Sequence, residues 1–457
     1  MRDPFSSVPL RRCLGTAGVL FLTLSVATPA SSVFVIVPGM LQVAGTGALW
    51  ALALAAIVCV ATAFIYAELS SAWPAAGGEY VMVARTLGPL AGFVMLGINL
   101  FNNLLFPPVA ALGIAAVAGA FWPGLPTVPV AVAAMAFATL LGILNVRVNA
   151  LVTGIFLAIE GLTLAIVAAL GLLHPGRAFD GMLLHPLMLA AGRLVPASAG
   201  AIGLATSIAI FALNGYGAAV YFGEEMHDAP RRIARTILLA LAATLLLEGG
   251  PVIAGLIGAR DLPGFLTAND PFGLLVRDYG GLGLARWVAL GVDIAIVNAI
   301  IAGILATARF LYATGRDRAW GRRVDPWLAA VHPSFASPAK ATLFAGAVGI
   351  GCCFVPLRFL LVLSGTGLIA IYAGIGLAVV RGRQSGATAH AQYRMPLFPL
   401  APIVAGAALA YVTWLNWLDP DEGRPGLIVT GAQIVGSAAY YLLVLRRRGW
   451  TAGDAPT

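Results

Sequence analysis

Two carboxylic acids stand inside long apolar runs of this chain. Glu160 lies in the sequence Phe-Leu-Ala-Ile-Glu-Gly-Leu-Thr-Leu, and Asp293 lies in Ala-Leu-Gly-Val-Asp-Ile-Ala-Ile-Val-Asn. An ionised acid at the centre of a lipid bilayer costs about 2.5–3.5 kcal/mol on insertion scales, so such groups are usually protonated, paired or placed on a proton or ion path. We therefore expect Glu160 or Asp293 to carry a proton or another coupling cation. The alternative is structural: a polar clamp to Asn298, or a helix break.

Backbone groups in the apolar run 14–41 offer a second kind of chemistry. Residues 27–32 read Ala-Thr-Pro-Ala-Ser-Ser, and Pro29 removes one backbone donor and clashes with the preceding turn. Amides and carbonyls freed at membrane depth are costly unless they line a cavity or meet protein partners. An interrupted membrane helix is therefore the best sequence indication of a transport site, although an ordinary proline kink would give the same pattern.

A second interruption lies in the apolar run 205–225. This run contains Asn214-Gly215-Tyr216-Gly217, which is turn chemistry inside a membrane segment. Five predicted helices separate the start of the first interrupted helix from the start of this one. Breaks at corresponding places in two five-helix halves are typical of an inverted-repeat transporter. Glycines that serve only close helix packing are the alternative.

The composition excludes a soluble protein. The chain has 457 residues, of which 60% are hydrophobic and 10% charged, and its mean hydropathy is +0.93. These values are typical of a polytopic helical membrane protein. The net charge of +8 does not predict nucleic-acid binding, because the arginines stand in short loops and tails. The four cysteines and five histidines show no metal-ligand spacing and no catalytic motif is present, so we expect neither a cofactor nor an enzyme.

Apolar runs long enough to span a bilayer, about 20 residues each, predict twelve transmembrane helices. The predicted helices are 14–41, 48–72, 88–120, 126–145, 149–173, 197–223, 233–259, 281–314, 340–357, 359–380, 397–418 and 426–445. The predicted division is an N-terminal tail (1–13), a first repeat (14–173), a loop (174–196), a second repeat (197–380), a loop (381–396), two further helices (397–445) and a C-terminal tail (446–457). A signal peptide cleaved near Ala27 or Ala30 is the alternative for the first run.

Loop charge predicts the orientation. The N-terminal tail, every second loop and the C-terminal run Arg446–Arg448 hold most of the 27 basic residues. Since cytoplasmic loops are enriched in Lys and Arg, we expect a multi-pass protein of the cell membrane with both tails and the loop 381–396 in the cytoplasm, and the loop 174–196 outside.

Several motifs resemble those of the amino acid–polyamine–organocation (APC) permeases. The segments similar to this family are Tyr66-Ala-Glu-Leu with Trp73-Pro-Ala-Ala-Gly-Gly-Glu-Tyr after helix 2, Gly223-Glu-Glu with Pro230-Arg-Arg-Ile after helix 6, Arg309-Phe-Leu-Tyr-Ala-Thr-Gly-Arg-Asp at the end of helix 8, Ser337-Pro-Ala before helix 9, and Val33-Phe with Pro38-Gly in helix 1. The helix 2–3 signature is specific, and the others support it. Together they cover both predicted repeats.

The resemblance implies a LeuT-like fold, an all-α 5+5 inverted repeat with helices 1 and 6 interrupted and helices 11 and 12 added. In the family, a Gly-x-Gly sequence at the helix 1 break presents bare amides to the substrate carboxylate. Here Ala30-Ser31-Ser32 stands at the matching positions, and Pro29 before it has no N–H. The amides of Ser31, Ser32 and Val33 are expected to cap an anion.

Helix 6 is expected to supply the other half of the substrate site. Carbonyl groups near Phe211, Ala212 and Asn214 would face a substrate ammonium group, because a helix C-terminus favours cations. Phe211 and Tyr216 are candidate aromatic partners of that cation, with core packing as the alternative.

Three asparagines in one predicted membrane helix, Asn99, Asn102 and Asn103, indicate either a polar cavity wall or hydrogen bonds between helices. The full predicted substrate-binding set is Thr28, Ala30, Ser31, Ser32, Val33, Asn102, Phe211, Ala212, Asn214, Gly215 and Tyr216.

Acids and arginines gather at the predicted cytoplasmic mouth. The predicted gating residues are Glu68, Glu79, Glu225 and Arg231, with Glu224, Arg85, Arg232 and Arg316 nearby. We expect salt bridges among them that differ between open and closed states and, being exposed, contribute little stability.

These features predict a secondary active transporter that moves amino acids by alternating access, with proton symport as the mechanism. An amino acid or amine exchanger, or a polyamine or organic-amine permease, is the alternative, the latter favoured by the missing glycines and the two buried acids. A receptor that binds an amino acid without moving it is a remote alternative. The expected partners are a small-molecule substrate, a proton or other cation, and the lipid bilayer, without nucleic acid.

Overall fold

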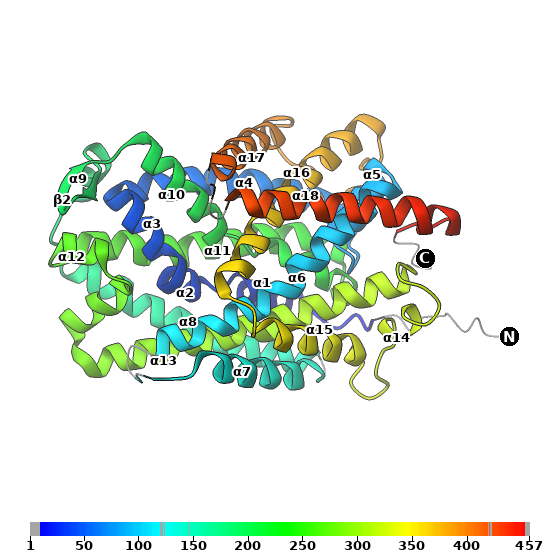
Figure 1. Ribbon diagram of the computed structural model, residues 1–457, viewed down its shortest axis with the longest axis horizontal. Helices are drawn as coiled ribbons and strands as arrows, with labels where there is room; N and C mark the ends of the chain where they lie inside the picture. Colours follow the sequence, from blue (N-terminus) through cyan, green and yellow to red (C-terminus); the bar gives the residue numbers. More distant parts are fainter. Residues whose placement is uncertain are drawn as a thin grey trace.

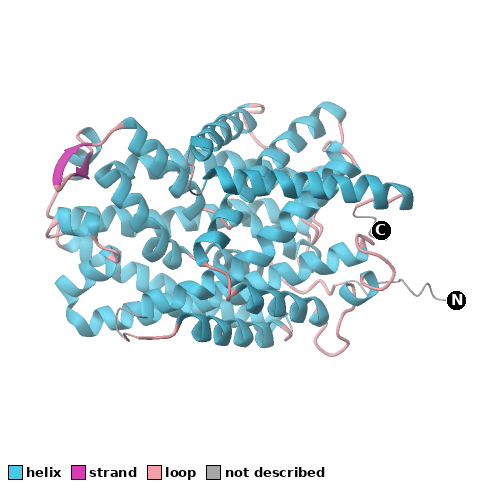
Figure 2. Ribbon diagram, viewed as in Figure 1, coloured by secondary structure: helices cyan, strands magenta, loops and turns pink. Residues whose placement is uncertain are grey.

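The computed structural model describes residues 10–118, 122, 124–144, 146–418, 420 and 423–452. Within these residues the protein is helical apart from one two-stranded hairpin, as Figure 2 shows. The predicted all-α class is confirmed. The predicted helix ends at residues 120 and 145, and the tail residues 1–9 and 453–457, lie outside the described residues.

The longer helices follow the apolar runs of the sequence. They are α1 (Thr16–Ala27), α3 (Val37–Ala44), α4 (Ala48–Ala72), α5 (Glu79–Leu87), α6 (Pro89–Ala118), α7 (Thr127–Gly142), α8 (Val146–Leu173), α10 (Ala199–Ala212), α11 (Ala229–Gly258), α13 (Pro271–Arg316), α15 (Ala339–Cys352), α16 (Leu357–Ser385), α17 (Leu400–Leu418) and α18 (Gly423–Tyr440). The short α-helices are α2 (Pro29–Ser31), α9 (Phe179–Leu184), α12 (Leu262–Thr267) and α14 (Asp325–Leu328). The π-helices are η1 (Ser32–Ile36) and η4 (Tyr441–Leu445), and the 3-10 helices are η2 (Gly45–Gly47), η3 (Tyr216–Glu225) and η5 (Arg446–Arg448).

Many of these helices could cross a membrane. In the described part of the chain, nine helical segments are long and apolar enough, and α7 and α15 are shorter apolar helices. Large apolar side chains are exposed on several helices, for example Leu246 of α11, Ile155 of α8 and Val435 of α18. Such exposed apolar surface is expected where a helix faces lipid instead of water.

The first interrupted helix breaks at a single residue. Helix α1 ends at Ala27, and Thr28 adopts the left-handed conformation with φ 44° before α2 begins at Pro29. A residue before proline is pushed out of the right-handed helical region, and proline cannot donate to the preceding turn. The helical run then continues through η1 and α3 to Ala44, so the break divides the predicted first helix into two helical pieces.

The second interrupted helix breaks at Asn214 and Gly215. Helix α10 ends at Ala212, Gly215 has φ 111°, and η3 begins at Tyr216. A Cβ atom added to Gly215 would collide with the backbone of Ala27. Glycine is therefore required twice over at this position, by its conformation and by the close approach of the other break.

The two breaks lie at the centre of the helical assembly. Helix α13 is largely buried and packs against α1, α6, α7 and α8, while α17 and α18 lie on the outside against α4, α6 and α16. Figure 1 shows β2, α9 and α12 at one end of the molecule and the first and last described residues toward the other end.

Three features differ from the sequence prediction. Helix α5 precedes the predicted third helix, and the predicted loop 174–196 contains α9 and the antiparallel strands β1 (Leu187–Ala190) and β2 (Arg193–Pro196). Helix α13 begins ten residues before the predicted start at Gly281, where it kinks with φ 75°.

Candidate functional site

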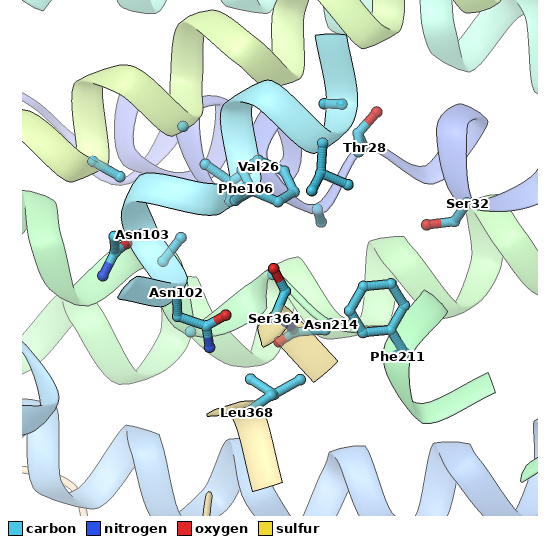
Figure 3. Close-up of a pocket in the computed structure, with 18 of the residues that line it drawn as sticks. Val26, Thr28, Ser32, Asn102, Asn103, Phe106, Phe211, Asn214, Ser364 and Leu368 are labelled. Atoms are coloured by element: carbon cyan, nitrogen blue, oxygen red, sulfur yellow. The ribbon is translucent and has the colours of Figure 1, made fainter. Parts of the chain in front are cut away.

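A cavity of about 200 Å³ lies where the two helix breaks meet. Its walls come from α1, α2, η1, α4, α5, α6, α10, η3, α13 and α16, and Figure 3 shows Asn102, Ser364, Asn214 and Phe211 grouped around its centre. The predicted substrate-binding residues that line it are Thr28, Ser31, Ser32, Asn102, Phe211, Ala212, Asn214 and Gly215. The structure thus brings residues from helices far apart in sequence to one cavity.

The other three predicted substrate-binding residues lie behind the wall of the cavity. Ala30 and Val33 are fully buried, and neither lines the cavity. Tyr216 is also fully buried, and its ring packs edge-on against Tyr66 with centroids 6.2 Å apart. Phe211 is therefore the aromatic residue of the helix 6 prediction that a solute in the cavity would contact, whereas Tyr216 is a core residue.

The two breaks are joined directly by a hydrogen bond. The Ser32 hydroxyl donates to the carbonyl oxygen of Ala212 at 3.0 Å, which links the start of η1 to the end of α10. The Tyr372 hydroxyl of α16 donates to Asn214 Oδ1 at 2.5 Å. Thr28 lines the cavity, but its hydroxyl is buried, points away from the cavity centre in Figure 3 and has no hydrogen-bond partner among the described residues.

Glu160 reaches the first break from α8. The backbone N–H of Ala30 donates to Glu160 Oε1 at 2.7 Å, and the carboxyl group is fully buried. Since Pro29 has no N–H, Ala30 supplies the first donor of the helical run that starts there. The second oxygen, Oε2, has no hydrogen-bond partner in the described part of the chain.

Asp293 lies away from this cavity. Its side chain on α13 is half-buried, one carboxyl oxygen is buried without a partner among the described residues, and it does not line the cavity. The Asn298 amide donates to Ser25 Oγ at 2.8 Å and to the carbonyl of Thr153 at 3.3 Å. The alternative of a clamp between Asp293 and Asn298 is not what the structure shows, because the Asn298 amide joins α1 to α8.

Glu79 forms part of the cavity wall. Its carboxyl group accepts hydrogen bonds from the Tyr66 hydroxyl at 2.8 Å, the Tyr221 hydroxyl at 2.9 Å and Asn99 Nδ2 at 2.9 Å. Asn103 in turn donates to the Tyr221 oxygen at 3.1 Å. The prediction of an exposed salt bridge at Glu79 is wrong, because the side chain is buried and these three partners are neutral.

Two other predicted gating acids are buried and form bidentate ion pairs, one with a buried arginine and one with a partly exposed arginine. Glu225 accepts from Nε and Nη2 of Arg309, and both side chains are 1% exposed. Glu68 accepts from Nε and Nη2 of Arg383 at 2.7 and 2.6 Å and from the backbone N–H of Met395. Each pair joins elements far apart in sequence, η3 to α13 and α4 to α16.

The expected arginine partners are only partly correct. Arg316 binds Glu224 at 2.6 Å, as the local gathering of charge suggested. Arg231 is exposed at the start of α11, and the arginine that binds Glu225 is Arg309. Sequence proximity favoured Arg231, but η3 runs alongside α13 and brings Glu225 to the inner end of that helix.

The sequence analysis gave no functional role to Glu248 of α11. Glu248 is fully buried, neither carboxyl oxygen has a hydrogen-bond partner among the described residues, and the group interacts with Ser32 and Glu160. The sequence signal that could have found it is its position in an apolar run, beside Gly249-Gly250-Pro251. Ser364 and Leu368 of α16 also line the cavity, and no sequence feature distinguishes them.

Comparisons with known proteins agree with this architecture. Residues 14–443 match a family described as amino acid permease. The chain is 25% identical to the methylthioribose transporter of Bacillus subtilis over 82% of this chain and 83% of the relative, and 23% identical to a branched-chain amino acid permease of the same organism over 89% and 88%. It is 24% identical to a low-affinity putrescine importer of Escherichia coli over 93% of this chain and 92% of the relative.

Proposed function

Because the chain belongs to the amino acid permease family, we propose that it is a secondary active transporter that moves a small amine-bearing solute by alternating access. The observation that carries this proposal is the cavity at the meeting point of two interrupted helices. In transporters with inverted repeats, half-helix ends at such a point bind the substrate near the middle of the membrane. The relatives include a branched-chain amino acid permease and a putrescine importer, so amino acids and amines are both candidate substrates.

The proposed architecture has twelve membrane-spanning helices in two inverted repeats, 14–173 and 197–380, followed by helices 11 and 12. Of the nine apolar segments, the first (Thr16–Ala72) contains two helical passages, and the shorter helices α7 and α15 complete twelve. The arginines near the described ends of the chain favour a cytoplasmic position for both termini in the cell membrane.

The proposed coupling ion is a proton, carried by Glu160 or Asp293. The contact between Glu160 and the Ala30 amide supports Glu160, because a change in its protonation would act directly on the helix 1 break. The ion pairs Glu225–Arg309 and Glu68–Arg383 are the proposed gate on the side of the termini. They would hold this side closed and separate when it opens.

Uptake into proteoliposomes tests the function. A mixed pool of labelled amino acids and amines would be offered to empty vesicles and to vesicles preloaded with unlabelled solute. The account expects saturable uptake of at least one solute, and the lack of both uptake and exchange would contradict transport. Flux only into preloaded vesicles would indicate an exchanger.

A matched pair of variants tests the cavity. Gly113 lines the cavity and Gly436 is an exposed residue of α18, and a Cβ atom added at either meets nothing within 4 Å. Gly113→Leu should reduce uptake strongly by filling the cavity, whereas Gly436→Leu should transport normally. Equal activity of the two variants would place the substrate elsewhere.

A further inference from the structure

We infer that two arginine-rich segments, 318–323 and 446–448, form one binding site for the phosphate headgroup of an anionic phospholipid. The two segments lie at the ends of the apolar helical segments Pro271–Arg316 and Gly423–Arg448. The site lies outside the transport cavity, so the inference does not depend on which solute is carried. The arginines of the site, called here the arginine face, are Arg318, Arg322, Arg323, Arg446, Arg447 and Arg448.

The arginine face carries a charge that its own surroundings do not neutralise. All six arginines are exposed, and neither stretch 317–325 nor stretch 446–452 contains an exposed acid. The acids of these stretches, Asp317 and Asp325, are buried. Asp325 interacts with Arg318 and Arg448, one from each segment. Two buried acids against six exposed arginines leave a strongly positive surface.

One aromatic ring fixes the two segments side by side. Phe93 of α6 packs against Trp320 of the first segment with ring centroids 6.4 Å apart, and against Trp450, just after the second segment, at 5.4 Å. The Arg448 side chain reaches the first segment, because a Cβ atom added to Gly321 would lie 3.5 Å from its Nη1. Arginines that are more than 120 residues apart in the sequence therefore belong to one surface.

The arginine face borders exposed apolar surface. Arg446 directly follows η4, whose Leu442 and Leu443 are exposed, and Val324 and Trp327 are exposed beside the first segment. Figure 1 shows α14 and the last described residues toward the same end of the molecule. Basic, aromatic and apolar side chains together at the ends of membrane helices are typical of the boundary between lipid and water.

The chemistry of this surface fits a lipid phosphate. A guanidinium group presents a planar fork of donors that can bind a phosphate through two hydrogen bonds. Clusters of four to eight basic residues at the end of a membrane helix attract anionic headgroups. A phospholipid could place its headgroup among the arginines and its acyl chains along the exposed apolar side chains. A free phosphate would gain only the first of these contacts, so we assign the site to a lipid.

Native mass spectrometry of the purified full-length protein in a neutral detergent tests the inference. The protein would be titrated with dioleoylphosphatidylglycerol or dioleoylphosphatidylcholine, which have the same acyl chains and differ in headgroup charge. We expect one phosphatidylglycerol molecule to bind at least about tenfold more tightly than phosphatidylcholine. Equal binding of the two lipids would overturn the inference. Displacement of the bound lipid by an equal concentration of inorganic phosphate would overturn the assignment to a lipid.

Two pairs of substitutions test whether the segments share one site. Arg322→Gln with Arg323→Gln changes the first segment, and Arg447→Gln with Arg448→Gln changes the second. Each pair should weaken phosphatidylglycerol binding by about tenfold and leave phosphatidylcholine binding unchanged, because each removes two positive charges. Both pairs should affect the same bound lipid molecule. If the two pairs remove different lipid molecules, the segments do not form one site.

A matched control removes the same charge elsewhere. Arg232 and Arg235 are exposed on α11, and Arg232→Gln with Arg235→Gln should change phosphatidylglycerol binding by less than about twofold. An equal loss in this control would show that binding follows the total charge of the protein, which would contradict the inference. If a variant does not fold, the comparison of the two lipids on the unmodified protein still decides.

Discussion

Glu160 and Glu79 are both buried acids, but they have different hydrogen-bond partners. The roles proposed for the two acids follow from this difference. Glu160 has one backbone donor and one oxygen without a partner among the described residues, whereas Glu79 is held by three donors in the cavity wall. A group with an unfilled oxygen can gain or lose a proton with little rearrangement. A group held by three hydrogen bonds is better suited to a fixed charge that attracts a cation.

At this scale the first prediction concerns coupling. Glu160→Gln should abolish accumulation driven by a proton gradient but retain exchange in preloaded vesicles, because Gln can accept from Ala30 but cannot carry a proton. Asp293→Asn should keep gradient-driven accumulation, since Asp293 has no part in the hydrogen bond that joins Glu160 to the helix 1 break. Both variants would be compared by uptake at equal and unequal pH across the vesicle membrane. Gradient-driven uptake by the variant with both substitutions would eliminate both acids as proton carriers.

The sequence predicted part of this chemistry. Glu160 could be expected near helix 1, because a buried acid needs a partner and the resemblance placed its helix beside the break. Tyr216 was expected in the site, but it faces the core, because the conformation of Gly215 decides which way the next residues turn. The unpartnered state of Glu248 depends on which side chains surround it in three dimensions, and no local pattern contains that information.

The two interrupted helices form the site, and the left-handed conformation of Gly215 allows them to approach each other closely. Gly215→Ala should lower the melting temperature and the uptake rate. Its left-handed conformation costs an L residue about 1–2 kcal/mol, and the added Cβ would strike the Ala27 backbone. The control, Gly436→Ala in α18, should be neutral or stabilising by up to about 1 kcal/mol. Thermal unfolding in detergent would measure both variants, and an equal response would show that the contact between the breaks is unimportant.

The ion pair between η3 and α13 is the second feature at this scale. Glu225→Gln should destabilise this closed arrangement by about 3–5 kcal/mol, because it leaves Arg309 buried without its partner. Replacing both residues, as in Glu225→Gln with Arg309→Met, should cost less than the sum of the single changes. The exposed Arg231→Gln should change stability by no more than about 0.5 kcal/mol. Additive effects in this double-mutant cycle would mean that the pair does not act as a unit.

The sequence predicted the breaks more reliably than the contacts of the broken pieces. Pro29 and the sequence Asn214-Gly215 dictate an interruption locally, so their positions were accessible without a structure. The partner of Glu225 could not be predicted from the sequence. It is set by the packing of η3 against α13, and not by which arginine is nearest along the chain. Helix α5 was missed because its first residues, near Gly77 and Gly78, resemble a loop.

At the scale of the whole molecule, composition alone predicted a helical membrane protein, and the described helices and the amino acid permease family agree with that prediction. Burial also follows the expected pattern, with α13 enclosed and α17 and α18 exposed through much of their length. What composition could not predict is the cavity, since it exists only where segments around residues 28, 102, 214 and 364 come together. The central claim is that this cavity serves proton-coupled uptake.

Steady-state accumulation in proteoliposomes tests that claim most directly. One solute identified in the pool experiment would be offered to empty vesicles that are more alkaline inside than outside, with and without a protonophore. The account predicts accumulation above the external concentration that collapses when the protonophore is added. Entry that stops at the external concentration, with or without the gradient, would contradict proton coupling.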